Sequence, residues 1–168
     1  MSERQGDATR TAVRDTVRAA RAPMGPISRS VVRTATSTGG CDDCRAVNAF
    51  QAWHDQDLTP SFNWEISFAD YGIPPAGKRA VIELVTAQII VPSGEWARLR
   101  MYTSLGTIPS NLDLFLTFQG NVSGQSIYVA THSIRSYSDG PISFDINRDN
   151  AETSGYALIC ISGYLADA

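Results

Sequence analysis

The chain has 168 residues, of which 18% are charged and 43% are hydrophobic, and its net charge is −3. That length fits one domain, and the hydrophobic fraction can fill a core, which excludes a wholly disordered chain. No apolar run approaches the ~20 residues that a spanning helix needs, so we expect no membrane span. Residues 1–7 contain no apolar signal region, which favours a cytoplasmic, particle-associated or non-classically exported protein.

Charge is divided unevenly along the chain. Residues 1–36 hold seven arginines and three acids, a net charge of +4, whereas residues 37–168 hold seven basic and fourteen acidic residues, a net charge of −7. We interpret residues 1–40 as a basic arm and linker, and residues 41–168 as the folded domain. A basic arm can bind nucleic acid, an acidic partner or the acidic body of a neighbouring copy. The alternative is a solvated tail without a partner.

The arm is expected to be partly helical or extended. Asp7 can cap a helix that Pro23 would end. On that helix, four arginines at spacings of four, four and three share one face and are the expected arm contacts: Arg10, Arg14, Arg18 and Arg21.

A second short helix is predicted near residues 43–55. Asp42 or Asp43 can cap it. Four apolar residues then fall on one helical face: Ala46, Ala49, Phe50 and Trp53.

After Pro60 the hydrophobic period changes to two, which is typical of half-buried strands. Turn residues separate the segments, and no helical pattern lies between them, which disfavours parallel crossover units. We therefore predict an all-β fold, an antiparallel β-sandwich of jelly-roll type with about seven or eight strands. The predicted strands cover residues 62–68, 79–91, 95–105, 112–119, 126–137, 141–148 and 155–165.

Cys41-Asp42-Asp43-Cys44 is a CxxC motif, and His54 follows ten residues after Cys44. These two cysteines and His54 are candidate zinc ligands, although a complete site needs a fourth ligand. The alternatives are a disulfide between the two cysteines or free thiols. We favour free thiols, because the acids between the cysteines oppose thiolate formation. We therefore expect no cofactor.

No nucleophile elbow, phosphate loop or dinucleotide motif is present, which favours a protein that is not an enzyme. His132 lies in a predicted strand and is expected to be a packed strand residue rather than a catalytic base. Cys160, between Ile159 and Ile161, is expected to be a small core residue.

The predicted strand over residues 95–105 offers the most suggestive surface. Alternation directs Leu99 and Met101 to one face, which we expect to be the core. The opposite face would present two aromatic and two basic side chains, a combination that suits stacking on a ligand or a place in an interface. The alternative is that acidic side chains on neighbouring strands cover this face. The candidate ligand or interface residues are Trp96, Arg98, Arg100 and Tyr102.

Three segments resemble parts of small uncharacterised bacterial β-sandwich proteins: Pro75-Ala76-Gly77-Lys78-Arg79-Ala80-Val81-Ile82-Glu83, Ile90-Val91-Pro92-Ser93-Gly94 and Ile161-Ser162-Gly163-Tyr164-Leu165. The resemblance covers about residues 70–165 and implies the sandwich fold but no activity.

Our first hypothesis is a non-enzymatic structural protein, a homo-oligomer whose basic arm docks on a neighbouring subunit or an acidic partner. One alternative is a module that binds carbohydrate or another ligand through the residue 95–105 strand. Another is a viral or phage coat-type protein whose arm binds nucleic acid.

Overall fold

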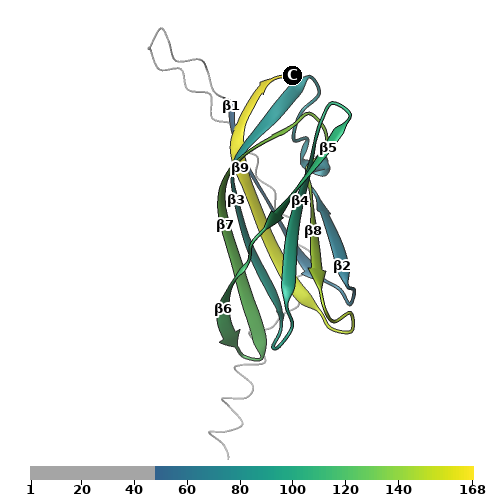
Figure 1. Cartoon of the computed structure of the whole chain (residues 1–168), viewed down its shortest axis with the longest axis vertical. Helices are drawn as coiled ribbons and strands as arrows, with labels where there is room; N and C mark the ends of the chain where they lie inside the picture. Colours follow the sequence, from purple (N-terminus) through teal and green to yellow (C-terminus); the bar gives the residue numbers. More distant parts are fainter. Residues whose placement is uncertain (1–47) are drawn as a thin grey trace, which may run out of the picture.

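The computed structural model describes residues 48–168, which form two antiparallel sheets packed face to face (Figure 1). The five-stranded sheet has the order β1-β9-β3-β7-β6, and the four-stranded sheet has the order β2-β8-β4-β5. This arrangement confirms the predicted antiparallel β-sandwich. The elements are β1 (Asn48–Leu58), β2 (Asn63–Ser67), η1 (Ala69–Tyr71), β3 (Lys78–Pro92), β4 (Ala97–Leu105), β5 (Ile108–Leu114), β6 (Thr117–Val122), β7 (Gln125–Ser138), β8 (Ser143–Arg148) and β9 (Gly155–Asp167).

The antiparallel partners are nested along the chain. β4 pairs with β5, β3 pairs with β7 around them, β2 pairs with β8, and β1 pairs with β9 at the outside. The chain therefore passes repeatedly from one sheet to the other. The described residues contain no helix that is long and apolar enough to span a membrane.

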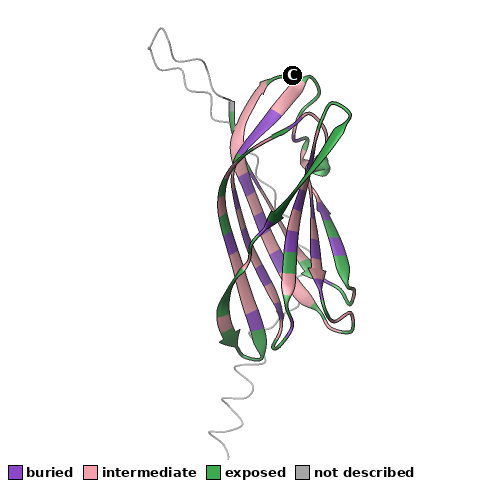
Figure 2. Ribbon diagram, in the orientation of Figure 1, coloured by how far each residue is buried: buried purple, intermediate pink, exposed green. Residues whose placement is uncertain are grey.

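The core lies between the sheets and is built by period-two alternation. In β8, Phe144 and Ile146 are fully buried, and in β4 Leu99 and Met101 are buried in the same layer. Burial alternates along β3 of the five-stranded sheet and along β4 and β8 of the four-stranded sheet (Figure 2). Burying large aliphatic and aromatic side chains in this way stabilises each strand against the opposite sheet.

The predicted helix near residues 43–55 is wrong for residues 48–55, which lie in β1; residues 43–47 lie outside the described residues. Phe50 is buried, Ala49 is exposed and Trp53 is half-buried, so these residues do not share one helical face. The reason is tertiary: β1 pairs with β9 in unbroken register from Asn48 opposite Leu165 to Leu58 opposite Gly155. This pairing outweighs a weak local helical pattern.

The predicted strand over residues 112–119 is two strands, and the described sandwich has nine strands rather than seven or eight. Leu114 ends β5 in the four-stranded sheet and is buried, whereas the next residue, Phe115, is 81% exposed. The chain then crosses to the five-stranded sheet, where β6 pairs with β7. Alternation continues through the crossing, so the pattern alone does not reveal the change of sheet.

Cys160 is not a core residue. It lies on β9 opposite Trp53, is half-buried and is a free thiol. The side chains of Ile159 and Ile161 occupy the core instead, because alternation sends residue 160 to the outer face of the five-stranded sheet.

β3 and β9 approach each other closely at a bulge between Ile82 and Leu84. Gly163 lies opposite Ile82, and a Cβ atom at this position would overlap the carbonyl oxygen of Val81. The backbone of a central strand cannot move aside without disturbing the ladder on both sides. The position therefore requires glycine.

We expect Gly163→Ala to lower the free energy of unfolding by about 2–3 kcal/mol, the usual cost of forcing an extra group into a packed site. Urea denaturation measures the change. Ser162→Ala, at the neighbouring half-buried position, is the control and should cost less than about 1 kcal/mol. Equal stability of the two variants would contradict the close approach.

Candidate interaction surfaces

The outer face of β4 is arranged as the sequence predicts. Leu99, Met101 and Thr103 are buried, while Arg98, Arg100 and Tyr102 point away from the core. Trp96 lies just before β4 and is 48% exposed. Its backbone N–H donates to the Asp149 Oδ1 atom at 3.1 Å, which fixes the start of the strand.

Asp113 on β5 binds both arginines of this face. Arg98 Nη2 lies 2.9 Å from Asp113 Oδ2, and Arg100 Nε lies 2.7 Å from Asp113 Oδ1. Hydrogen bonds from Arg100, and then from Arg98, lower the pKa of Asp113 to about 2. Asp113 thus neutralises part of the positive charge, as expected if acids of a neighbouring strand cover this face. We call Arg98, Arg100 and Asp113 the arginine clamp.

A shallow pocket of about 360 Å³ lies beside the arginine clamp, where the chain leaves β5. Arg98 and Asp113 line its polar side, and Leu114, Phe115 and Leu116 line its apolar side. His132 Nε2 donates to the Phe115 carbonyl oxygen at 2.9 Å and so holds the crossing segment on β7. Phe115 was not among the predicted site residues, because its exposure depends on the change of sheet.

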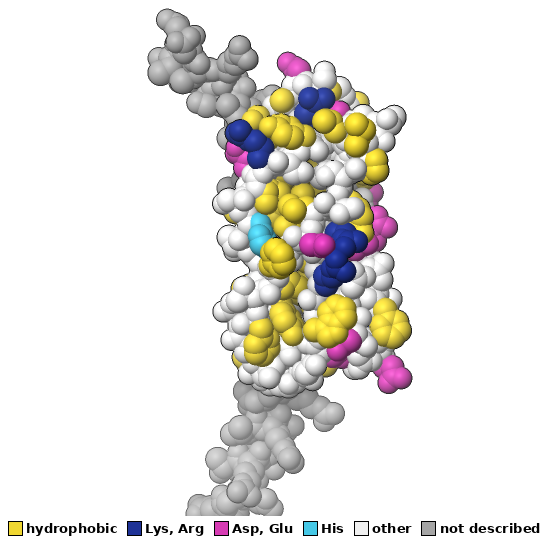
Figure 3. Space-filling model, in the orientation of Figure 1, with side chains coloured by type: hydrophobic (Ala, Val, Ile, Leu, Met, Phe, Trp, Pro, Cys, Tyr) yellow, Lys and Arg dark blue, Asp and Glu magenta, His cyan; other side chains and the backbone are white. Residues whose placement is uncertain are grey.

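Large hydrophobic side chains are exposed along this side of the molecule. Figure 3 shows hydrophobic surface over the region where β4, β5 and β6 lie in Figure 1. Phe115 is 81% exposed and Ile108 is 68% exposed. We call the set the rim patch: Leu105, Ile108, Leu112, Phe115, Phe118 and Val122.

The rim patch arises partly from core-type positions that nothing in the described chain covers. In the β4–β5 ladder, Leu112 lies opposite Met101 and Leu105 lies opposite Ile108, on the same side of the sheet as the core. Met101 is 1% exposed, but Leu112 is 38% exposed. The β4–β5 hairpin therefore carries its apolar inner pattern beyond the region that the other sheet covers.

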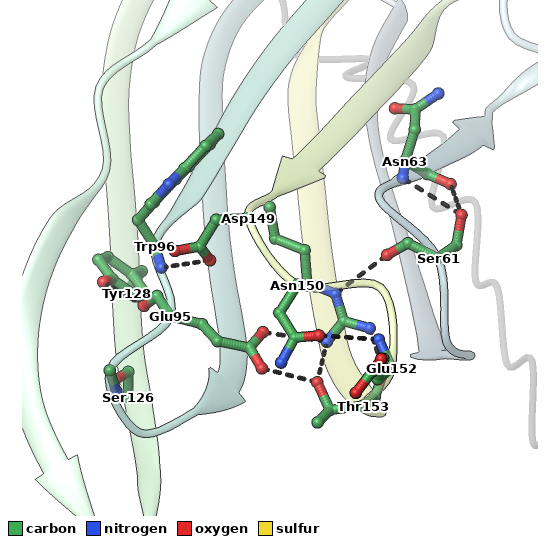
Figure 4. Close-up of polar contacts among 12 residues, drawn as sticks. Ser61, Asn63, Glu95, Trp96, Ser126, Tyr128, Asp149, Asn150, Glu152 and Thr153 are labelled. Atoms are coloured by element: carbon green, nitrogen blue, oxygen red, sulfur yellow. Dashed lines mark hydrogen bonds and ion pairs between the residues drawn. The ribbon is translucent and has the colours of Figure 1, made fainter.

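The opposite end of β4 is joined to the sandwich by a buried ion pair that the sequence did not reveal. Arg148, the last residue of β8, lies 3.2 Å from the Glu95 carboxylate, and both side chains are buried. Arg148 also donates to the Ser61 carbonyl oxygen, while Thr153 donates to Glu95 at 2.7 Å. Figure 4 shows these partners converging from separate loops. The sequence feature that could have indicated this ion pair is Arg148, a charged residue that alternates with Phe144 and Ile146 and so falls on the inner face.

An aromatic ring completes this network. The Arg148 guanidinium carbon lies 4.5 Å from the centre of the Trp64 ring, and Trp64 is 6% exposed. This cation–π contact and the hydrogen bonds compensate the guanidinium for its loss of water. The network is structural, because it leaves the charge enclosed.

Both ring nitrogens of His54 have partners within the described chain, so neither is free to bind a metal. Its Nδ1 atom is hydrogen-bonded to the Tyr71 hydroxyl and its Nε2 atom lies 3.3 Å from Gln56 Oε1. Its ring also packs edge-on against Phe68. Residues 48–168 contain no group of three or more side chains placed to hold a metal ion. The other predicted ligands and the arm contacts lie outside the described residues: Cys41, Cys44, Arg10, Arg14, Arg18 and Arg21.

Comparisons with protein-family models and with curated proteins found no match. Among solved structures, the chain is similar to that of the giant freshwater prawn Macrobrachium rosenbergii extra small virus VLP, determined by cryo-EM. The similarity covers 78% of this chain and 88% of that chain, with 11% identity and a TM-score of 0.29. At that TM-score the similarity carries no argument about function.

We expect Arg148→Met to destabilise the fold by about 3–5 kcal/mol, because it leaves the Glu95 carboxylate buried without its partner. Lys78→Met is the control, since Lys78 pairs at the surface with Asp167, whose side chain is 90% exposed. Its cost should stay below about 1 kcal/mol. Denaturant unfolding compares the two, and similar losses would contradict a special role for the buried pair.

The arginine clamp predicts a titration. Because the pKa of Asp113 is depressed, its stabilising effect is complete above its ordinary pKa of 3.8 and is lost as pH falls toward about 2. We expect Arg100→Gln to raise the Asp113 pKa more than Arg98→Gln does. Carboxyl-carbon NMR titration measures both, with Arg79→Gln as a control that should leave Asp113 unchanged. An unaltered pKa in Arg100→Gln would refute the clamp.

Proposed function

We propose that this protein is a non-enzymatic structural subunit that assembles with copies of itself. The rim patch is the observation that carries the proposal. Large apolar side chains exposed together along one side of a molecule are typical of an interaction site. A second copy is the occupant we propose, because the patch continues the core pattern of the β4–β5 hairpin and follows two edge strands, β5 and β6.

Edge strands support the same role. β5 and β6 each pair on one side only within the described sheets. Unpaired backbone groups at an edge favour association with another chain unless charge or irregularity prevents it. Asp113 and the irregular pairing beside Gly120 limit strand addition here, so side-chain packing through the rim patch is the favoured contact.

A coat-type shell subunit is the second candidate, and the nested strand pairing favours it. A long antiparallel hairpin folded over so that β1–β9 encloses β2–β8, β3–β7 and β4–β5 is the connectivity of a jelly roll, with β6 added at one edge. Jelly rolls are common in capsids. In such a shell, the basic residues of segment 1–36 would contact nucleic acid.

A carbohydrate-binding face on β4 has less support. Asp113 already engages Arg98 and Arg100, so a ligand would have to displace an internal partner from both. We therefore propose that Trp96 and the arginine clamp border the interface between copies.

We expect Phe115→Ala to weaken self-association about thirtyfold while leaving the melting temperature nearly unchanged. A central interface aromatic commonly contributes about 2 kcal/mol or more, whereas an exposed ring contributes little to the monomer. Sedimentation velocity over a concentration series measures the change. Phe62→Ala is the control, because Phe62 is 60% exposed but lies outside the rim patch. A chain that is monomeric at every concentration, or equal effects of both variants, would contradict the proposal.

A further inference from the structure

The outer face of the five-stranded sheet carries a second apolar surface, separate from the rim patch. At its centre Leu158 on β9 lies beside Gln88 on β3, which pairs with Val129 on β7. These positions are half-buried although they face away from the core. We call the set the broad face: Ile90, Ile127, Val129, Tyr156, Leu158 and Cys160.

The broad face is hollowed at its centre. A depression of about 230 Å³ is lined by side chains of three adjacent strands, including Thr86, Val129, Leu158 and Cys160. None of the described elements packs on this side, because residues 48–168 contain only the two sheets, the short turn η1 and loops. The apolar side chains therefore lie ready to be covered.

One border of the broad face is acidic. Asp55 and Asp57 on the edge strand β1 lie opposite Leu158 and Tyr156. Burial raises the pKa of Tyr156, and the two nearby carboxylates raise it further. Neither carboxylate forms an ion pair with another described residue. The border thus offers two unneutralised negative charges next to apolar surface.

The chain itself supplies a segment with the matching chemistry. Residues 1–47 lead directly into β1, the strand that carries Asp55 and Asp57. Residues 1–36 have a net charge of +4 from seven arginines and three acids, and they also include apolar residues such as Val31 and Val32. An extended chain of that length reaches far beyond the roughly 20 Å width of a five-stranded sheet. Attachment at the edge also gives it a high effective concentration at this face.

We infer that the protein's own N-terminal segment, residues 1–47, binds across the broad face, with arginines on Asp55 and Asp57 and apolar side chains on Leu158 and Val129. This inference is distinct from assembly through the rim patch, because the broad face and the rim patch have no residue in common. It also assigns the arm a site within its own subunit rather than on a neighbour.

Limited trypsin digestion of the full chain tests the inference, since the seven arginines of residues 1–36 are natural cleavage sites. We expect the double variant Asp55→Asn/Asp57→Asn to be cleaved within residues 1–36 about fivefold faster than the natural chain, because two surface charge contacts are lost. Added salt should accelerate cleavage of the natural chain and leave the variant unchanged.

The control removes the same charge from the other sheet. Glu65→Gln/Asp145→Asn neutralises two acids on the outer face of the four-stranded sheet, where Glu65 lies opposite Asp145. Its cleavage rate should stay within about twofold of the natural chain, a difference equivalent to well under one surface ion pair. Alkylation of Cys160, followed by peptide mass spectrometry to separate it from Cys41 and Cys44, should be slow in the natural chain and fast in the Asp55/Asp57 variant.

Three results would overturn the inference. The first is equal cleavage of the natural chain and the Asp55/Asp57 variant. The second is protection that disappears on dilution, which would assign the bound segment to a second copy. The third is a protected arm with unprotected Cys160, which would place its site elsewhere. Self-association is read separately by sedimentation, so failure here and failure of the rim patch are distinguishable.

Discussion

The buried pair between Arg148 and Glu95 is the constraint on which one end of the sandwich depends. Removing two charges from water is costly, and only a complete set of partners makes it tolerable. Ser61, Thr153 and the Trp64 ring supply that set from separate segments. The loops that bring them must therefore adopt one arrangement together. Trp96 follows Glu95 directly, so the start of β4 and the adjoining arginine clamp are positioned by the same network.

Sequence periodicity predicted most of the sandwich, because most strands bury one face and expose the other. It failed in β1, where Ala49, Phe50 and Trp53 fit a helical face and only pairing with β9 decides between the two. It also failed between Leu114 and Thr117, where alternation runs on while the chain changes sheet. Both errors concern contacts with distant strands, which local patterns do not contain.

In the candidate surfaces, too, some features are predictable from the sequence and others are not. The outward direction of Arg98 and Arg100 follows from alternation, so it was predictable. Their shared partner, Asp113, depends on the β4–β5 register and was not. Exposure of Ile108 and Leu112 was equally hidden, since both carry the pattern of core residues. Whether such a residue is covered depends on how far the opposite sheet extends, and local sequence patterns do not predict that extent.

The two apolar surfaces have different charged residues beside them, so we expect them to bind different partners. The rim patch lies beside two arginines whose charge Asp113 partly neutralises, so it suits a mainly apolar contact between copies. The broad face is bordered by Asp55 and Asp57, so it suits a basic segment. An arginine that pairs with Asp55 or Asp57 cannot bind nucleic acid at the same time. A polyanion would therefore compete with the sheet for the arm, and its binding would uncover Leu158 and Val129. In a coat-type shell, that competition would link capture of nucleic acid to the exposure of a second apolar surface for assembly.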